Sequence, residues 1–203
     1  MTAEPLRPDI ARNLRDRAAV AREAHTRRMR GLLSATEIDQ GRHSDHANTQ
    51  YLRRVVSEHG WPGRSLVGAE ASVAAWQLVL RADHRPDFQR LVLRLIAPAV
   101  EQGEATVQQW AHLHDRCSVN SGTPQLYGTQ YRLGPSGPEV LPIHDPAQLG
   151  ARRSSVGLVP FAAAQEALRR RLVRQPHPGP ADDPGDDDPH PEATAVEFMG
   201  SAA

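Results

Sequence analysis

The run at residues 120–130, Asn-Ser-Gly-Thr-Pro-Gln-Leu-Tyr-Gly-Thr-Gln, is dense in side chains that can form hydrogen bonds. Amide and hydroxyl groups dominate it, and it contains no charged residue. If its second half is a strand, Gln125, Tyr127 and Thr129 share one face and Gln130 lies on the other. A purely structural hairpin would more usually present Val and Ile on its inner face. The run therefore indicates a binding site, with a polar scaffold as the alternative.

Two charged residues precede this run. Asp115 could serve as a general acid or base, and Arg116 could offer its planar guanidinium to a carboxylate or phosphate group. Both come at the end of a predicted helix, just before the predicted hairpin. The alternative is an ion pair that fixes the helix end to the hairpin.

A second polar cluster, Arg81-Ala82-Asp83-His84-Arg85-Pro86, falls at a predicted corner between two helices. Polar groups at a corner can converge on a cleft, and Asp83 beside His84 could orient an imidazole or a substrate cation. In the alternative, Asp83 caps the helix that begins near Pro86 and His84 is exposed.

No metal or cofactor site is predicted. His112 and His114 are two residues apart, so on a helix they point about 200° away from each other and cannot share an ion. The single cysteine, Cys117, excludes disulfides and sites with several thiolates, and burial is its expected role. Trp76 is expected in the core or as a wall of the cleft.

The composition excludes further chemistries. All 24 basic residues of the 203-residue chain are Arg, so neither a lysine Schiff base nor a P-loop lysine is possible. Residues 175–203 contain seven acidic residues and no Arg, so the rest of the chain carries a net charge of +7. This excess fits a general preference for Arg, and no basic run interleaved with aromatic residues indicates nucleic-acid binding.

The sequence also predicts a cytoplasmic protein without a membrane segment. Its start lacks the apolar stretch of a secretory signal. The longest uncharged run rich in apolar residues, 71–80, is far shorter than the roughly 20 residues that cross a bilayer.

The expected fold is mainly α, with six or seven helices and a single short β-hairpin in one domain. We predict an Arg-rich helix and linker over residues 1–43, a globular domain over 44–174 and a disordered acidic tail over 175–203. The first helix is placed at 8–33 and the linker at 34–43. Further helices are expected up to residue 59 with Ser44 or Asp45 as the cap, at 67–82, and from Pro86 in a first-turn position. A capping box of Thr106 and Gln109 predicts a helix at 106–117, Asp145 is the expected cap of the next helix, and the last is placed at 160–174. The hairpin strands are expected at 125–133 and 139–143.

Several stretches together resemble a family of bacterial proteins catalogued as domain of unknown function 6624. They are Gly60-Trp61-Pro62, Ser65-Leu66-Val67-Gly68, Ala74-Ala75-Trp76, Ala82-Asp83-His84, Pro86, Phe88-Gln89, Asp115-Arg116, Pro124-Gln125-Leu126-Tyr127-Gly128-Thr129-Gln130, Pro142-Ile143-His144-Asp145, Arg152-Arg153 and Val156-Gly157-Leu158. The resemblance covers roughly residues 45–172. It implies no activity, but it implies that the matching polar positions form one site. Arg81 stands where relatives commonly carry His.

Two functional hypotheses follow. The first is a small enzyme of the hydrolase or lyase type that performs acid/base chemistry on a small polar substrate. The second is a non-catalytic module that binds a small ligand or a peptide. Convergence of Asp83, Asp115, Arg116, Tyr127 and Gln130 on one pocket would favour the enzyme. The candidate catalytic residues are Asp83, His84, Asp115 and Tyr127, and the candidate substrate-binding residues are Trp76, Arg116, Gln125, Thr129 and Gln130.

Overall fold

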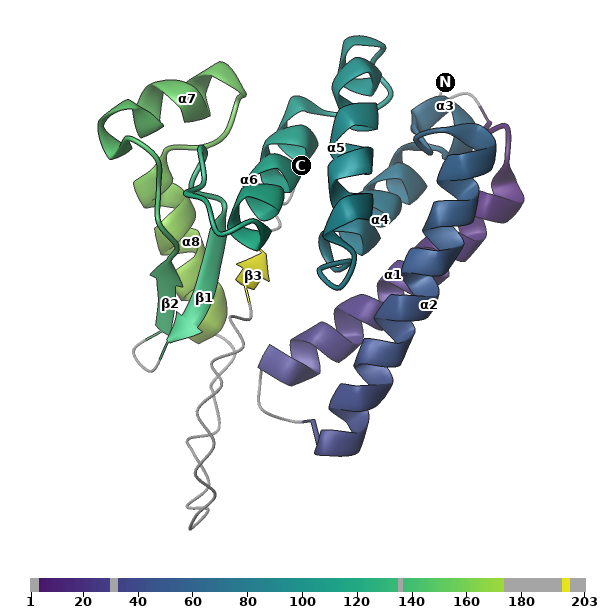
Figure 1. Cartoon of the computed structure of the whole chain (residues 1–203), viewed down its shortest axis with the longest axis horizontal. Coiled ribbons are helices and arrows are strands. Elements are labelled where there is room, and N and C mark those ends of the chain that lie inside the picture. Colours follow the sequence, from purple (N-terminus) through teal and green to yellow (C-terminus); the bar gives the residue numbers. More distant parts are fainter. Residues whose placement is uncertain (1–3, 30–32, 135–136, 174–194, 198–203) are drawn as a thin grey trace.

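The computed structural model describes residues 4–29, 33–134, 137–173 and 195–197. Within these ranges eight α-helices and one antiparallel hairpin confirm the mainly α prediction (Figure 1). One helix more than expected is present because a four-residue turn, α3, precedes α4. The helices are α1 (Pro8–Met29), α2 (Ala35–His59), α3 (Arg64–Val67), α4 (Ala69–Leu80), α5 (Pro86–Glu101), α6 (Val107–Asn120), α7 (Leu149–Ser155) and α8 (Phe161–Val173).

The predicted linker at 34–43 is wrong, because most of it is the first part of α2. Ser34 caps this helix: its hydroxyl accepts from the backbone N–H of Glu37 at 3.3 Å, and the Glu37 carboxylate accepts from the N–H of Ser34 at 2.9 Å. Ser44 and Asp45, which were expected to cap the helix, lie inside it. The polar first half of α2 lacks an apolar stripe, so periodicity alone indicated a linker there.

Helix α4 lies at the centre of the core, and nine of its twelve residues are buried. The Arg-rich helix α1 packs along it (Figure 1), with Ile10, Leu14 and Ala18 in the same hydrophobic cluster. Leu52 and Val55 of α2 join this cluster. Burial of these apolar side chains fixes α1 to the body of the protein. The small residues among them let α1 and α4 approach closely.

Helices α5 and α6 pack side by side and contribute Val92, Ile96 and Leu113 to the same hydrophobic core. Pro86 occupies the first turn of α5, as predicted. The predicted capping box of α6 is also present: the Thr106 hydroxyl accepts from the N–H of Gln109 at 3.1 Å, and the Gln109 side chain accepts from the N–H of Thr106 at 2.9 Å. These two helices carry three of the polar residues of the candidate site, Gln89, Arg116 and Asn120.

The hairpin consists of β1 (Gln130–Gly134) and β2 (Gly137–Val140), which pair with Tyr131 opposite Val140. Its first strand is shorter than predicted, because the backbone of residues 125–129 turns around a buried carboxylate instead of continuing the ladder. A third strand, β3 (Ala195–Glu197), pairs antiparallel with the other edge of β1. It belongs to the tail that was predicted to be disordered; the other residues of that tail lie outside the described ranges.

The last two helices follow the hairpin. A 3-10 turn, η1 (Pro146–Gln148), precedes α7, and α8 packs against both α7 and β2. Asp145 does not cap η1 through its side chain, contrary to the prediction, because its backbone is left-handed (φ 40°) rather than extended as at an N-cap. Within the described residues, no helix is long and apolar enough to cross a membrane.

Candidate functional site

The carboxylate of Asp83 is held by three side-chain donors from two helices. Arg116 of α6 donates from Nε to Oδ1 at 2.8 Å and from Nη2 to Oδ2. Asn120 of α6 donates to Oδ1 at 2.8 Å, and Gln89 of α5 donates to the same atom at 3.1 Å. The Asp83 side chain nevertheless stays 44% exposed, whereas that of Arg116 is only 9% exposed. Asp83 is thus a fixed carboxylate with one face open to solvent.

The corner between α4 and α5 positions Asp83. At the end of α4 the backbone N–H of Ala82 donates to the carbonyl of Val79 at 3.0 Å. In the turn that follows, the N–H of Arg85 donates to the carbonyl of Ala82 at 2.8 Å. The fully buried Gln89 donates to the carbonyl of Val79 at 3.1 Å as well as to Asp83. One amide group therefore satisfies the open end of α4 and orients the carboxylate.

Arg116 connects Asp83 to the hairpin. Its Nη1 donates to the side-chain oxygen of Gln130 at 3.2 Å, and Gln130 donates to the hydroxyl of Thr129 at 3.1 Å. That hydroxyl donates in turn to Asp115 at 2.9 Å. A continuous chain of hydrogen bonds therefore runs from the exposed carboxylate of Asp83 to the buried carboxylate of Asp115.

Asp115 has a different environment from Asp83. It is fully buried, and its two oxygens accept from the backbone N–H groups of Leu126 at 2.8 Å, Tyr127 at 3.0 Å and Thr129 at 3.0 Å, besides the Thr129 hydroxyl. These donors use the hydrogen-bonding capacity of the carboxylate within the protein. Asp115 therefore organises the loop before β1 and presents no face to solvent.

The carbonyl groups of the same loop face two arginines of α7. Arg152 donates to the carbonyl of Leu126 at 2.8 Å, and the buried Arg153 donates to the carbonyl of Tyr127. Gln125, also fully buried, donates to the backbone carbonyls of Gln130 at 3.0 Å and Leu141 at 2.9 Å. The polar run at 120–130 is thus largely engaged in internal hydrogen bonds, which supports the scaffold alternative for its buried members.

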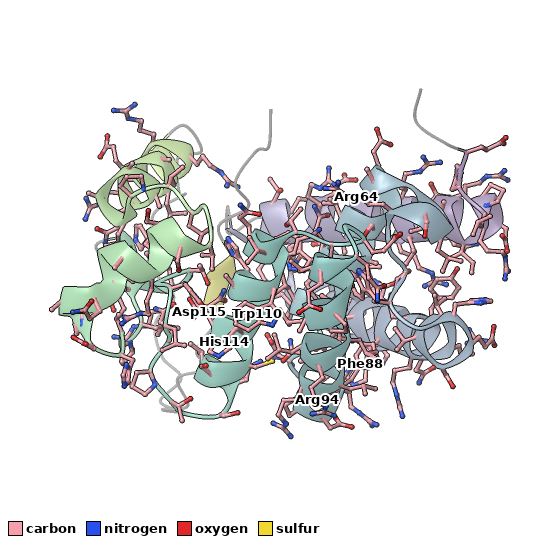
Figure 2. The ribbon with its side chains drawn as sticks, turned by 90° about the horizontal axis from the view of Figure 1, so that it is seen from above. Arg64, Phe88, Arg94, Trp110, His114 and Asp115 are labelled. Atoms are coloured by element: carbon pink, nitrogen blue, oxygen red, sulfur yellow. The ribbon has the colours of Figure 1, made fainter. Side chains whose placement is uncertain are left out.

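Trp76 and Tyr127 belong to aromatic groups around α6. The indole N–H of Trp76 donates to the carbonyl of Gln109 at 3.0 Å, and its ring meets that of His112 edge-on, with centroids 5.7 Å apart. The ring of Tyr127 packs against those of Trp110 and His114, at 6.0 Å and 5.9 Å. Figure 2 shows Trp110, His114 and Asp115 along α6, whereas Phe88 and Arg94 lie on α5.

His84 lies at the Asp83 corner but faces α2. Its ring stacks on that of His46, with centroids 3.8 Å apart and an interplanar angle of 25°. This contact brings Asp45 of α2, the neighbour of His46, to the region of Asp83. Of the nine sequence candidates, Asp83, Arg116 and Gln130 are hydrogen-bonded together, Thr129 links them to Asp115, and His84 adjoins them.

Two carboxyl groups at this corner have opposite pKa shifts. Burial acts to raise the pKa of Asp83, but the charge and hydrogen bonds of Arg116, with those of Asn120 and Gln89, outweigh it, so the pKa is lowered. Burial raises the pKa of Asp45, and the negative charge of Asp83 raises it further against the opposing charge of Arg81. The site therefore combines a carboxylate that stays ionised with a carboxyl group that protonates more readily.

The charged groups near this corner also affect a histidine of α1, His25. Burial lowers the pKa of His25 in α1 to about 4, and the charges of Arg81, Arg28 and Arg116 act in the same direction. His25 is therefore uncharged near pH 7. The sequence did not select His25, Asp45 and His46 as site residues, because each lies far along the chain from Asp83 and no local motif marks it. Gln89, six residues after Asp83, belongs to the stretches that resemble the family but was not a candidate site residue.

Among the residues that the structure describes, no group of three or more His, Cys, Asp or Glu side chains is arranged to hold a metal ion. Cys117 is 8% exposed, and burial raises its pKa to about 11. Its environment is that of an inert core thiol.

Comparison with known proteins places the chain in one group of sequences. The model of a family described as "Family of unknown function (DUF6624)" matches residues 30–171. This range contains every element of the Asp83 corner except His25 and its helix α1. No curated protein and no solved structure matches the chain.

Proposed function

The chain belongs to a family of unknown function, DUF6624, and from the geometry of the Asp83 corner we propose that it is a hydrolase- or lyase-type enzyme for a small polar substrate. The observation that carries the proposal is the pair formed by Asp83 and Asp45. One carboxylate is fixed and ionised, and the other has a raised pKa. Titratable groups whose environments push their pKa values apart are typical of acid/base sites.

In this proposal Asp45 transfers the proton. A carboxyl group with a raised pKa is a better general acid near neutral pH than an ordinary one, and its conjugate base is a stronger general base. Asp83 stays ionised and orients a polar or positively charged part of the substrate. The neutral His25 lies within range of the same arginines, since the charges of Arg81 and Arg116 lower its pKa.

The substrate is expected to be small, and it is expected to carry polar or negatively charged groups. Arg81 ends α4 beside the corner, and its charge acts on both Asp45 and His25. If relatives use a histidine at this position for catalysis, Arg81 gives this chain a permanent cation instead of a proton carrier. We therefore expect it to bind a negatively charged substrate group rather than to take up a proton.

The proposal can be tested by a thermal-shift screen of a metabolite library on the full-length protein. Compounds that raise the melting temperature are then incubated with the protein, and their consumption is followed by proton NMR. We expect Asp83→Asn to lose stabilisation by the compound. Asp45→Asn should keep binding but lose turnover by about 10²-fold or more, the usual contribution of a general acid or base.

Asp39→Asn is the matched control, since Asp39 is an exposed carboxylate on the same helix, six residues before Asp45. It should leave both binding and consumption unchanged. If no compound selectively stabilises the wild-type protein, the small-molecule site is rejected. If Asp45→Asn turns over the compound as fast as the wild type, the acid/base role of Asp45 is wrong.

The second candidate is a non-catalytic module that binds a small ligand or peptide. It is favoured by Asp115, Gln125 and Thr129, whose hydrogen bonds are used inside the protein rather than directed to a cleft. A compound that binds in an Asp83-dependent manner and is recovered unchanged after long incubation would support this module over the enzyme.

A further inference from the structure

A small hollow lies between α2 and the α4–α5 corner, beside the two residues that follow Asp83 in the chain, His84 and Arg85. It has a volume of about 70 Å³ and is lined by His46, Thr49, Gln50, Arg53, His84 and Arg85. Two arginines and two histidines line it, and no carboxylate does. The lining is therefore more basic than the body of the chain, in which 24 Arg accompany 17 acidic residues over residues 1–174.

The lining side chains carry donors of the kind that bind oxyanions, although the surface that they expose inside the hollow is mainly apolar. Arg53 and Arg85 are permanently charged and offer planar guanidinium groups. Arg85 lies 3.5 Å from the carboxylate of Asp87, a pair in which both side chains are largely exposed, so the contact is weak and easily exchanged. Gln50 adds an amide group from the turn of α2 that precedes Arg53.

The histidine pair makes the charge of the hollow depend on pH. Nδ1 of His46 lies 2.9 Å from the backbone carbonyl oxygen of Arg42, so Nδ1 carries the hydrogen. Nε2 of His46 is then an acceptor while the ring is neutral and becomes a donor when the ring is protonated. Protonation of both stacked rings would place two cations 3.8 Å apart, a repulsion that a bound anion would offset.

We propose that this hollow binds a small oxyanion of the phosphate or sulfate type, and that binding is coupled to protonation of the His46–His84 pair. The size agrees with this class, since the hollow is several times larger than the roughly 10–15 Å³ that admits one water. In the proposed enzyme the hollow would anchor the charged end of a substrate whose reacting part lies at Asp83. Only that assignment rests on the proposed function.

The charges around His84 determine the direction of the pH effect. Burial lowers the pKa of His84, the charges of His46 and Arg85 lower it further, and Asp83 opposes them. Two further carboxyl groups lie near this junction: Asp45 on α2 beside His46, and Asp87, which pairs with Arg85. An anion in the hollow would raise the pKa of His84, so it binds with uptake of a proton. Affinity should therefore increase as the pH falls.

Sulfate is the appropriate probe, because its charge stays constant over the range in which histidines titrate. The full-length protein is titrated with inorganic sulfate at constant ionic strength, and the histidine C–H resonances are followed by NMR. We expect saturable binding that is about tenfold tighter at about pH 5.5 than at about pH 8, on either side of the ordinary histidine pKa of about 6.5. Inorganic phosphate at the lower pH should shift the same resonances.

Neighbouring residues of α2 provide a matched pair of variants. Arg53 lines the hollow, whereas Arg54 is an equally exposed arginine that is not among its lining residues. Arg53→Gln should weaken sulfate binding about fivefold or more, and Arg54→Gln should leave it unchanged. The double variant His46→Asn/His84→Asn should bind sulfate weakly and without dependence on pH.

Three results would overturn the inference: no saturable binding, equal weakening by Arg53→Gln and Arg54→Gln, or a pH dependence that persists without the two histidines. Melting curves of each variant exclude a loss of fold as the cause. Sulfate binding requires no turnover, so its failure leaves the acid/base proposal for Asp45 and Asp83 intact. Failure of the metabolite screen likewise leaves a positive sulfate result intact.

Discussion

Asp83 and Arg116, 33 residues apart in the sequence, form a two-point ion pair that joins the α4–α5 corner to α6. The pair differs from an ordinary surface contact because Arg116 is almost completely buried and also donates to Gln130 at 3.2 Å. Asp83, by contrast, remains exposed on one side. The corner is therefore held by a buried cation whose partner is accessible to a ligand.

A double-mutant cycle of Asp83→Asn and Arg116→Gln should measure a coupling free energy of about 1 kcal/mol. This lies near the upper end for surface pairs, because two hydrogen bonds reinforce the pair while solvent screens the exposed side. Urea unfolding of the four proteins gives the value. Additive effects of the two substitutions would contradict the predicted coupling.

The same pair has a defined pH dependence. The folded-state pKa of Asp83 is lowered, so its stabilising contribution is present above the ordinary aspartate pKa and is lost as the pH falls through the lower folded value. The stability difference between wild type and Asp83→Asn should therefore shrink below about pH 4. A difference that grows on acidification would contradict the assigned cause.

Asp115→Asn is expected to destabilise the protein by about 3 kcal/mol, because Asn offers one acceptor where the carboxylate offers two. At least one of the N–H groups of Leu126, Tyr127 and Thr129 would face an amide NH₂ in a buried site. Denaturant unfolding measures the loss, with the exposed Asp39→Asn as control. If Asp115→Asn keeps its stability but loses ligand binding, Asp115 belongs to the site rather than to the scaffold.

The sequence predicted those elements whose signals are local. Thr106 with Gln109 and Pro86 with Asp87 mark helix starts within one turn, and both helices begin there. The capping pair Ser34 and Glu37 is equally local, but the polar residues after it concealed the helix. Capping chemistry was in this case a better indicator than apolar periodicity.

The arrangement of the candidate site could be predicted only in part. Asp83, Arg116 and Gln130 were selected by residue type, but their contact requires the packing of α5 against α6. The apposition of His46 and His84 depends on where α2 crosses the α4–α5 corner, which no local pattern encodes. Buried Asp115 was indistinguishable from a catalytic carboxylate in the sequence, since burial is a property of the complete fold.

Gly128 occupies a position that a larger residue should not fill. Its φ is +63°, and an added Cβ would lie 2.9 Å from Cε2 of Phe161. Gly128→Ala should therefore destabilise the protein by about 2–3 kcal/mol, combining backbone strain with a steric clash in the core. Thermal and urea unfolding measure the loss.

Gly122 is the matched control for this substitution. It has a similar φ of +70°, but nothing lies within 4 Å of its added Cβ. Gly122→Ala should cost only the backbone term, about 1 kcal/mol. Phe161→Leu should recover part of the loss in Gly128→Ala and none in Gly122→Ala. Equal losses for the two glycines would show that the contact with Phe161 is unimportant.

His112 should make the protein sensitive to mild acid. The ring is 5% exposed, and burial lowers its pKa to about 4, against the opposing charge of Asp115. Between this value and the unfolded pKa of about 6.5, the unfolded chain binds a proton that the folded chain excludes. The contribution of neutral His112 is therefore complete above about pH 6.5 and decreases as the pH falls toward 4, by at most about 3 kcal/mol.

Urea unfolding at several pH values should show this loss, and His112→Gln should flatten the slope between about pH 6.5 and pH 4 because Gln does not titrate. The substitution also removes an edge-on contact with Trp76, so its stability at pH 7 will be lower, and the test lies in the slope rather than in the absolute value. NMR provides the independent measurement. If the His112 ring titrates near pH 6.5 in the folded protein, its burial does not exclude the proton and this source of acid sensitivity is absent.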